Sequence, residues 1–437
     1  IYGLANATPY AKDSFHRYLI NGETTAVNPE RVGTKVAAVF NKKIASGESV
    51  TIRLRLAKET QEEPFKDFER IFKQRLAEAD EFYRAVQNPN LSEDQTRVQR
   101  QALAGMLWSK QLYYYDVEQW LRGDPEIPVT PSGRNRNQDW EHLVNFDLIS
   151  MPDKWEYPWY ATWDLAFHCL PLVLLDPDFA KRQLELITRE WYLHPNGQLP
   201  AYEWRFEDVN PPVPAWAAWR VYKIDAKQQG RPDRNFLQGV FHKFLLNFTW
   251  WVNRKDEDGR NVFQGGFLGM DNISVFDRSE ALPTGGHIDQ ADGTAWMASY
   301  CLSMLKIALE LAKDDSVYQD IATKFFEHFL RIANAMTKEG GHGRSLWDEE
   351  DGFFYDALHL PNGEFMSLKV RSMVGLLPLF AVDTLEPDLL DKMPDFSRRM
   401  EWFYSNRPHL SENLACIHTP GIGRRRLLSI LTRERLG

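Results

Sequence analysis

The chain has 437 residues, of which 43% are hydrophobic and 13% aromatic, a composition that favours two or three globular domains with sizeable apolar cores. Its formal net charge is −9 and its lysines and arginines are scattered, which argues against nucleic acid as a partner. The three cysteines are far apart and no run of 18 apolar residues occurs, so neither a disulfide framework, a zinc cluster nor a membrane span is indicated.

The first part of the chain has the pattern of β-strands. In "SVTIRLRLA", Val50, Ile52, Leu54 and Leu56 alternate with polar residues, as in a strand with one buried face. A sandwich needs several more such strands. We therefore predict that residues 1–57 are the C-terminal part of an N-terminal β-sandwich domain.

From residue 58 onward the apolar residues recur with the 3.6-residue period of a helix. We predict a linker helix within 58–90 and a helical domain over 91–437. Its helices are expected at 91–120, 159–174, 177–192, 214–228, 233–254, 288–313, 316–336, 367–381, 390–404 and 421–436.

Long loops rich in Trp, Gly and Pro separate alternate pairs of these helices, whereas short turns join the helices within a pair. Such loops are too long to be mere connectors. The alternation predicts a mainly α fold, an (α/α)6 toroid, in which the long loops build a site at one mouth.

Seven tryptophans fall between residues 155 and 219, interleaved with acidic residues. Flat indole rings beside carboxylates suit a pyranose, which has apolar C–H faces and a fringe of hydroxyls. The alternative is that these indoles fill the core of a large helical domain.

Three motifs, "YPWYATWDLAFH", "QGGFLGMDNISVFDR" and "LWDEEDGFFYD", occur in this order and resemble those of glycoside hydrolase family 63, including its bacterial MGH1-type members. A more distant likeness is to the trehalases of family 37. The resemblance extends over nearly the whole chain and implies an inverting mechanism that cleaves α-linked glucosides inside an (α/α)6 barrel.

The segment "FLGMDN" resembles the family's general-acid element, which implies that Asp271 is the catalytic acid. Apolar neighbours such as Phe267 and Met270 would desolvate this carboxyl group and raise its pKa, as a general acid requires. Phe267, Gly269, Met270 and Asn272 are expected to contact the substrate. Phe267 and Leu268 replace the acidic residue and the serine that usually precede the glycine.

The other motifs imply further substrate-binding residues. In "YPWYATWDLAFH" the resemblance assigns sugar contacts to Trp163, which would stack on the ring, and to Asp164, which would accept hydrogen bonds; Asp164 could instead complement a helix dipole. Trp159, Tyr160, Glu203, Trp204 and Asn210 complete the expected binding set. Asn210 before Pro211 is equally typical of a stiffened loop, and His168 is expected to be a packing residue.

Two features concern what the chain lacks. "DEEDGFF" is interpreted as a hairpin turn at Asp351-Gly352 rather than a metal site, and no metal or cofactor motif is recognised. No segment resembles the setting of the family's general base, and Glu412 is more simply a capping or turn residue. The chain is therefore interpreted as incomplete, with an open ring and an exposed apolar seam on its final helices.

The sequence thus predicts an inverting α-glucoside hydrolase that acts on a small gluco-oligosaccharide or a glucosylated small molecule. The alternatives are a trehalase-like or other α/α-toroid glycosidase, or an inactive sugar-binding toroid. The expected partner is a small carbohydrate, with neither nucleic acid nor membrane involved. The unpaired cysteines fit a cytoplasmic location, although the chain opens on Ile1 and a leader could precede it.

Overall fold

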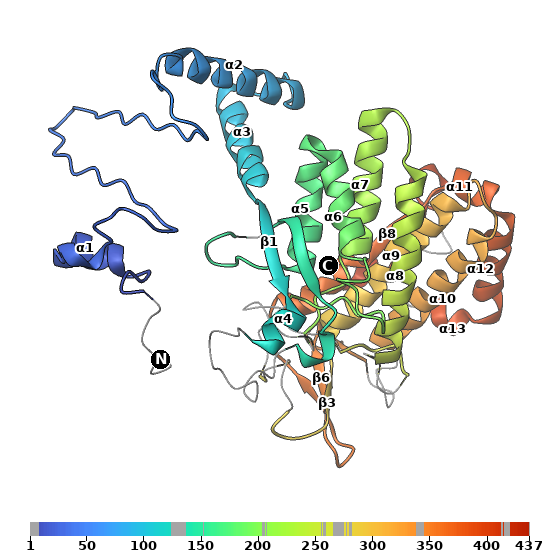
Figure 1. Ribbon diagram of the computed structural model, residues 1–437. Coiled ribbons are helices and arrows are strands. Elements are labelled where there is room, and N and C mark those ends of the chain that lie inside the picture. Colours follow the sequence, from blue (N-terminus) through green and yellow to red (C-terminus); the bar gives the residue numbers. More distant parts are fainter. Residues whose placement is uncertain are drawn as a thin grey trace. The chain divides into compact units, whose positions relative to one another are not determined.

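The computed structural model describes residues 8–123, 137–151, 153–202, 206, 208–254, 256, 259–264, 275–276, 278, 282–337, 345–411, 414 and 420–436. The chain divides into two compact units (Figure 1). The first unit comprises residues 1–85 with 125–128, and the second comprises the remainder. Each unit is described by itself below.

The first unit contains helix α1 (Ser14–Asn21), the short 3-10 helix η1 (Thr24–Ala26) and helix α2 (Phe68–Val86). Residues 34–57, expected as strands, form no strand in this structure, and the alternating side chains of "SVTIRLRLA" are exposed. A strand needs a partner for its backbone hydrogen bonds, and an alternating pattern does not supply one. The assignment of this segment to a β-sandwich stays a prediction.

The second unit opens with helix α3 (Glu93–Trp108), whose N-terminus is closed by a reciprocal capping box between Ser92 and Gln95. The helix predicted over 91–120 stops here. The next residues, "KQLYYYD", form strand β1 (Lys110–Asp116), which pairs antiparallel with β2 (Val144–Ser150). Aromatic residues such as those of β1 favour strands. Pairing of β1 with the distant strand β2 therefore prevailed over the helical period of its sequence. Helix α4 (Val117–Arg122) and the 3-10 helix η3 (Gln138–Trp140) lie between the two strands in sequence.

The predicted helices in the middle of the chain are confirmed. Their observed bounds are α5 (Thr162–Leu175), α6 (Pro177–Leu186), α7 (Pro214–Gln229), α8 (Arg234–Arg254), α9 (Ala291–Leu311) and α10 (Tyr318–Thr337). Within pairs the connectors are short: Asp176 alone joins α5 to α6, and residues 230–233 join α7 to α8. Long segments precede α7 and α9, as the sequence predicted.

Helix packing follows the alternation along the chain. Helix α5 packs against α7, and α7 packs against α9, so the helices that follow long loops lie side by side. Helices α6 and α8 also contact each other, and α10 contacts α9 and the later helix α12 (Pro394–Asn406). Apolar side chains from these helices form one continuous buried core. Helix α9 is buried along almost its entire length, and the described part of the fold is mainly helical.

The C-terminal third mixes short strands with helices. Strands β3 (His287–Asp289), β6 (Asp356–His359) and β7 (Phe365–Leu368) form one sheet, and β4 (Trp347–Asp348) pairs with β5 (Phe353–Phe354). The β4–β5 hairpin confirms the predicted turn at Asp351-Gly352, with Gly352 at φ +59°. The remaining elements are the 3-10 helix η5 (Met373–Phe380), β8 (Val382–Leu385), α11 (Pro387–Lys392), α13 (Pro408–Ser411), η6 (Ile422–Arg424), β9 (Arg426–Ser429) and α14 (Arg433–Leu436).

Two predicted helices are wrong in this third. The first two residues of the segment 367–381 belong to strand β7, and most of its remainder forms the 3-10 helix η5. The segment 421–436 contains strand β9, which pairs antiparallel with β8. A short apolar run cannot be assigned to helix or strand from its period alone. Leu428 and Ile430 are fully buried, whereas Leu427 and Leu431 are half-buried, so these four residues do not form the exposed apolar seam that was expected on a final helix.

No helix in the described ranges is both long and apolar enough to cross a membrane.

Candidate active site

The residues predicted to bind a sugar fall into two groups. The structure describes Trp159, Tyr160, Trp163, Asp164 and Asn210. Outside the described residues lie Glu203, Trp204, Phe267, Gly269, Met270, Asp271, Asn272 and the weighed alternative Glu412.

A loop is held against the first turn of helix α5. The side-chain oxygen of Asn210 accepts a hydrogen bond from the backbone N–H of Trp163 at 3.3 Å. The N–H of Thr162 donates to the carbonyl of Ala201 at 2.8 Å, and the Thr162 hydroxyl donates to the carbonyl of Pro200 at 2.5 Å. These bonds satisfy N–H groups that a helix leaves unpaired at its N-terminus, and they bring Asn210 beside Trp163 and Asp164 in the fold.

Trp163 and Asp164 are both half-buried. The Trp163 ring lies 5.9 Å from that of Phe167, which in turn lies 5.8 Å from that of Trp216 on α7. Burial raises the pKa of the Asp164 carboxyl group, because the charged form loses solvation. An indole beside a carboxyl group that is partly accessible is a chemically suitable pair for a sugar.

Tyr160 occupies a different environment from the one expected. Its side chain is fully buried, it packs edge-to-face on Tyr192 at 5.2 Å, and its hydroxyl lies 2.8 Å from that of Thr162. Tyr160 is thus packed in the core of this structure, and its sugar contact stays a prediction. Trp159 remains half-buried against Tyr157.

His168 lies one turn after Asp164. Its Nδ1 atom is 2.8 Å from the hydroxyl of Ser150, and burial lowers its pKa. These contacts agree with the prediction that His168 is a hydrogen-bonded packing residue.

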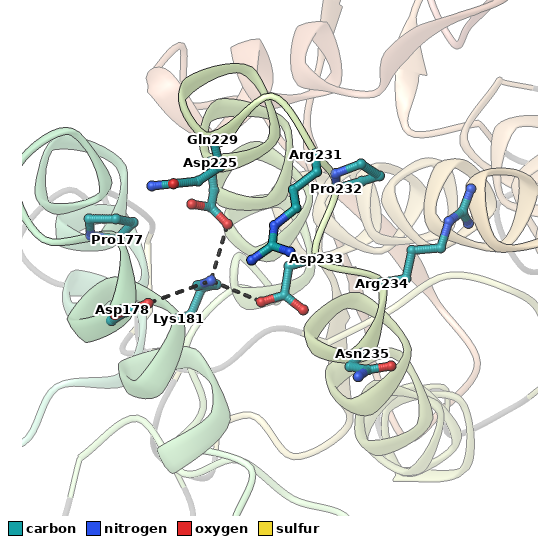
Figure 2. Close-up of a pocket in the computed structure, with 10 residues that line it drawn as sticks. All are labelled: Pro177, Asp178, Lys181, Asp225, Gln229, Arg231, Pro232, Asp233, Arg234 and Asn235. Carbon is teal, nitrogen blue, oxygen red and sulfur yellow. Dashed lines mark hydrogen bonds and ion pairs between the residues drawn. The ribbon is translucent and has the colours of Figure 1, made fainter.

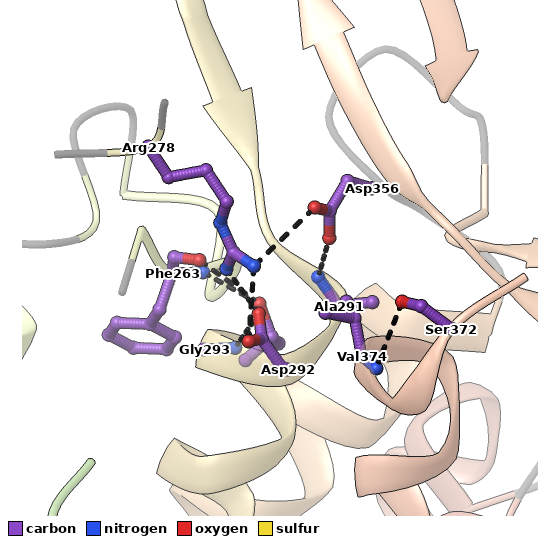
Figure 3. Close-up of polar contacts among 9 residues, drawn as sticks. Phe263, Arg278, Ala291, Asp292, Gly293, Asp356, Ser372 and Val374 are labelled. Carbon is purple, nitrogen blue, oxygen red and sulfur yellow. Dashed lines mark hydrogen bonds and ion pairs between the residues drawn. The ribbon is translucent and has the colours of Figure 1, made fainter. Parts of the chain in front are cut away.

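The segment that carries Asp271 is anchored on both sides to the start of helix α9. Before it, the N–H of Phe263 donates to the Thr294 hydroxyl at 2.9 Å, and the Phe263 carbonyl accepts from the N–H of Gln290 at 3.3 Å. After it, Arg278 forms an ion pair with Asp292 (Figure 3). Both flanks therefore meet the first turn of one buried helix.

Arg278 is the centre of a buried ionic cluster. Its guanidinium group contacts both carboxylate oxygens of Asp292, one of them at 3.1 Å, and lies 3.8 Å from the carboxylate of Asp356 on β6. Asp356 also accepts a hydrogen bond from the N–H of Ala291 at 2.8 Å, as Figure 3 shows. The side chains of Arg278 and Asp292 are completely buried, so each charge depends on the others for stabilisation.

The electrostatics of the cluster show a conflict between burial and pairing. Burial raises the pKa of Asp356 to about 6, the nearby charges of Asp292 and Asp289 add to this shift, and Arg278 opposes it. A low local dielectric penalises unpaired charge strongly. The cluster therefore fixes the position of Arg278, and with it the end of the segment that carries Asp271.

No role was predicted for Arg278, Asp292 or Asp356. Arg278 ends the motif "QGGFLGMDNISVFDR", which was the only available signal. Its partners lie 14 and 78 residues later in the chain, and no local spacing pattern connects residues so far apart.

The N-terminal ends of α5 and α9 belong to the same end of the helical unit. The carbonyl of Gly197, in the long segment before α7, accepts a hydrogen bond from Asn247 near the C-terminal end of α8. A methyl group on Gly197 would lie 2.5 Å from the carbonyl oxygen of Leu246, so this contact requires glycine. Helix α8 leads toward Phe263, which contacts the start of α9, so the segment before α7 and Phe263 adjoin the same helix ends.

A polar cavity of about 560 Å³ lies at the opposite end, beside the short connectors. Figure 2 shows Lys181 between the carboxylates of Asp178, Asp225 and Asp233, at 3.7, 3.1 and 2.9 Å. The residues that line it come from the start of α6, the end of α7, the α7–α8 connector and the start of α8, and none of them was predicted to bind sugar. This cavity is separate from the candidate active site.

Comparison with known families gives one match that covers more than half of the chain. The model of the mannosylglycerate hydrolase MGH1-like glycoside hydrolase domain matches residues 157–406. This range includes Trp163, Asp164, Asn210 and Asp271, together with the Arg278 cluster.

A curated relative, the uncharacterized protein YMR196W of Saccharomyces cerevisiae, is 50% identical over 457 residues; the alignment covers 99% of this chain and 42% of that protein. The chain therefore spans less than half the length of that relative. Among solved structures, the GH63 mannosylglycerate hydrolase of Thermus thermophilus is similar in its complexes with Tris (16% identity, TM-score 0.40, 59% of this chain and 74% of that one) and with glucose (19%, 0.42, 59% and 73%). From the extent of the family match, the chain belongs to the MGH1-like glycoside hydrolases of family 63.

Proposed function

We propose that the protein containing this chain is an inverting α-glucoside hydrolase with Asp271 as its general acid. Its substrate would be a small gluco-oligosaccharide or a glucosylated small molecule. The family model is named for a hydrolase of mannosylglycerate, a sugar joined to a small organic acid, and this supports the second class. We further propose that the paired helices of this chain form part of an (α/α)6 toroid.

The observation that carries the proposal is the common anchoring of the two motif segments. The motif with Trp163 is anchored by the hydrogen bond between Asn210 and Trp163. The end of the motif with Asp271 is anchored by the ion pair between Arg278 and Asp292. These contacts support a site at this end of the helical unit, because they hold Asn210 at the start of α5 and Arg278 at the start of α9. An active site built on rigid helix ends keeps its reacting groups in place.

The proposed chemistry requires two carboxyl groups. Asp271, in its protonated form, would donate a proton to the glycosidic oxygen as the bond to the leaving group breaks. A second carboxylate, about 6.5 to 9.5 Å away, would remove a proton from the water that attacks the anomeric carbon from the opposite face. Trp163 and Asp164 would hold the glucosyl ring between them.

The test uses the full-length protein and the substitution Asp271→Asn, which keeps the shape of the side chain and removes its proton. Hydrolysis of glucosides with poor leaving groups should fall by at least about 10²-fold. Aryl glucosides with good leaving groups need less protonation and should be affected less. Proton NMR of the first product should show β-glucose, the inverted anomer.

Asp277→Asn is the matched control, because it removes another carboxylate from the same stretch of sequence. Equal and mild losses for both substrates in Asp271→Asn would show that Asp271 is not the acid. A substrate panel that includes trehalose distinguishes a trehalase-like enzyme. Tight sugar binding without turnover in the full-length protein would favour an inactive binding protein.

A further inference from the structure

Two histidines and an aspartate converge where strand β3 meets strand β6. His287 and Asp289 are two residues apart on β3, so their side chains point to the same face. His359 pairs directly with His287 across the antiparallel strands. Asp289 and His359 are buried and His287 is partly accessible, so the group has one side toward the surface.

The ligand atoms of these side chains are close enough to share one ion. The Nε2 atoms of His359 and His287 lie 2.7 and 3.7 Å from the two oxygens of Asp289, and all three groups offer ligand atoms within 4.8 Å of one another. Bonds of 2.0 to 2.1 Å in a tetrahedron place neighbouring ligand atoms about 3.3 Å apart. The observed distances bracket this value. The imidazole rings of His287 and His359 are stacked, with centroids 4.6 Å apart. Rotation of these rings would direct a nitrogen lone pair of each histidine to one point.

The surrounding charge also favours a cation. Asp289, Asp292 and Asp356 are buried near one another, and Arg278 is buried among them. Among the residues that the structure describes here, these three carboxylates, when ionised, carry two more charges than Arg278 offsets. Arg260 lies near His359, and Asp256 lies near Asp289. The positive charge of Arg260 and the negative charge of Asp256 offset each other, so they leave this net charge unchanged. A divalent ion would neutralise the excess.

We propose that His287, Asp289 and His359 bind a divalent transition-metal ion of the zinc type, with a water molecule completing the coordination. Two imidazoles and one carboxylate suit such ions, whereas Ca²⁺ and Mg²⁺ prefer ligand sets made of oxygen atoms. The sequence predicted no metal site because the ligands lie on strands 70 residues apart.

The proposed ion would link the two strands beside helix α9. Strand β3 ends the long segment that carries Asp271, and it leads directly into α9. Metal binding should therefore stabilise the fold at this position. The proposal does not depend on glycosidase activity, and its test measures binding and stability alone.

The experiment titrates the metal-free full-length protein with Zn²⁺ and, separately, with Ca²⁺, using calorimetry and thermal unfolding. One Zn²⁺ should bind per chain and raise the Tm, and Ca²⁺ should do neither. His287→Ala should weaken Zn²⁺ binding by at least about 100-fold, since loss of even an outer partner costs 10- to 100-fold. Co²⁺ in place of Zn²⁺ should give a visible absorption band that this variant lacks.

His142→Ala is the control, because His142 lies beside another histidine, His194, with ring centroids 5.2 Å apart. This variant should bind Zn²⁺ as the wild type does. His287 is the most accessible of the three ligands, so its replacement should leave the Tm of the metal-free protein nearly unchanged. Absence of stoichiometric Zn²⁺ binding, or binding that is lost in His142→Ala and kept in His287→Ala, would overturn the proposal.

Discussion

The buried ionic cluster predicts a large and specific loss of stability when Arg278 is replaced by methionine. Methionine keeps much of the apolar volume of the arginine stem but removes the charge. Asp292, with no exposed surface, and Asp356, 5% exposed, would then remain buried without their cation. Removing one partner from a buried ion pair costs about 3 to 5 kcal/mol, so the free energy of unfolding should fall by an amount in this range.

The assay is urea unfolding of the 437-residue chain near pH 7, followed by tryptophan fluorescence, with the m-value checked for a change of mechanism. Arg331→Met is the matched control, because Arg331 forms an exposed pair with Glu327 at 2.6 Å on a helix. Such a pair contributes about 0.3 to 0.5 kcal/mol. Adding Asp292→Asn to Arg278→Met should recover part of the loss, since an amide is less costly to bury than a charge. Equal losses in the two methionine variants would refute this reasoning.

Two further predictions concern the same region of the fold. The pKa of Asp356 in the folded protein, about 6, is above its ordinary value, so this group contributes stability at low pH that is lost as pH rises from about 4 to 6. Asp356→Asn removes that contribution, and the unfolding free energy of the variant minus that of the wild type should increase over this window and then level off; a constant difference from pH 4 to 7 would contradict the assignment. Gly286→Ala should destabilise the chain by more than about 1 to 3 kcal/mol, because Gly286 has φ +78° and a Cβ there would lie 1.8 Å from the His359 carbonyl oxygen. Gly352→Ala, at φ +59° with open space around it, should cost only about 1 to 2 kcal/mol, and similar melting temperatures for the two variants would show that the close approach is not limiting.

The sequence predicted the middle helices well because each has a long apolar face with a helical period. Helices α5 to α10 were located, although α6 ends at Leu186 rather than at residue 192, and the hairpin at Asp351-Gly352 followed from local turn chemistry. Strands β1 and β9 were missed, because their short apolar or aromatic runs fit a helix equally well and only pairing with β2 and β8 decides the conformation.

The candidate site was predictable to the extent that it is local. Trp163 and Asp164 were singled out because they share a motif at one helix start, and their sugar contacts stay predictions. The burial of Tyr160 was not predicted, because the direction of a side chain depends on packing, here against Tyr192. Arg278, Asp292 and Asp356 form a cluster only in three dimensions, and no period or spacing in one sequence indicates it. The general-acid role of Asp271 stays a prediction.

The separation of long and short connections has a consequence for how substitutions combine. Helix α5 has 14 residues, so its two ends are about 21 Å apart. Energetic coupling between substitutions usually fades beyond about 7 to 10 Å. Changes at Trp163, at the long-loop end, should therefore be thermodynamically independent of changes in the Lys181 network at the other end. The helical unit can in this way vary its loops while its short connectors maintain the packing.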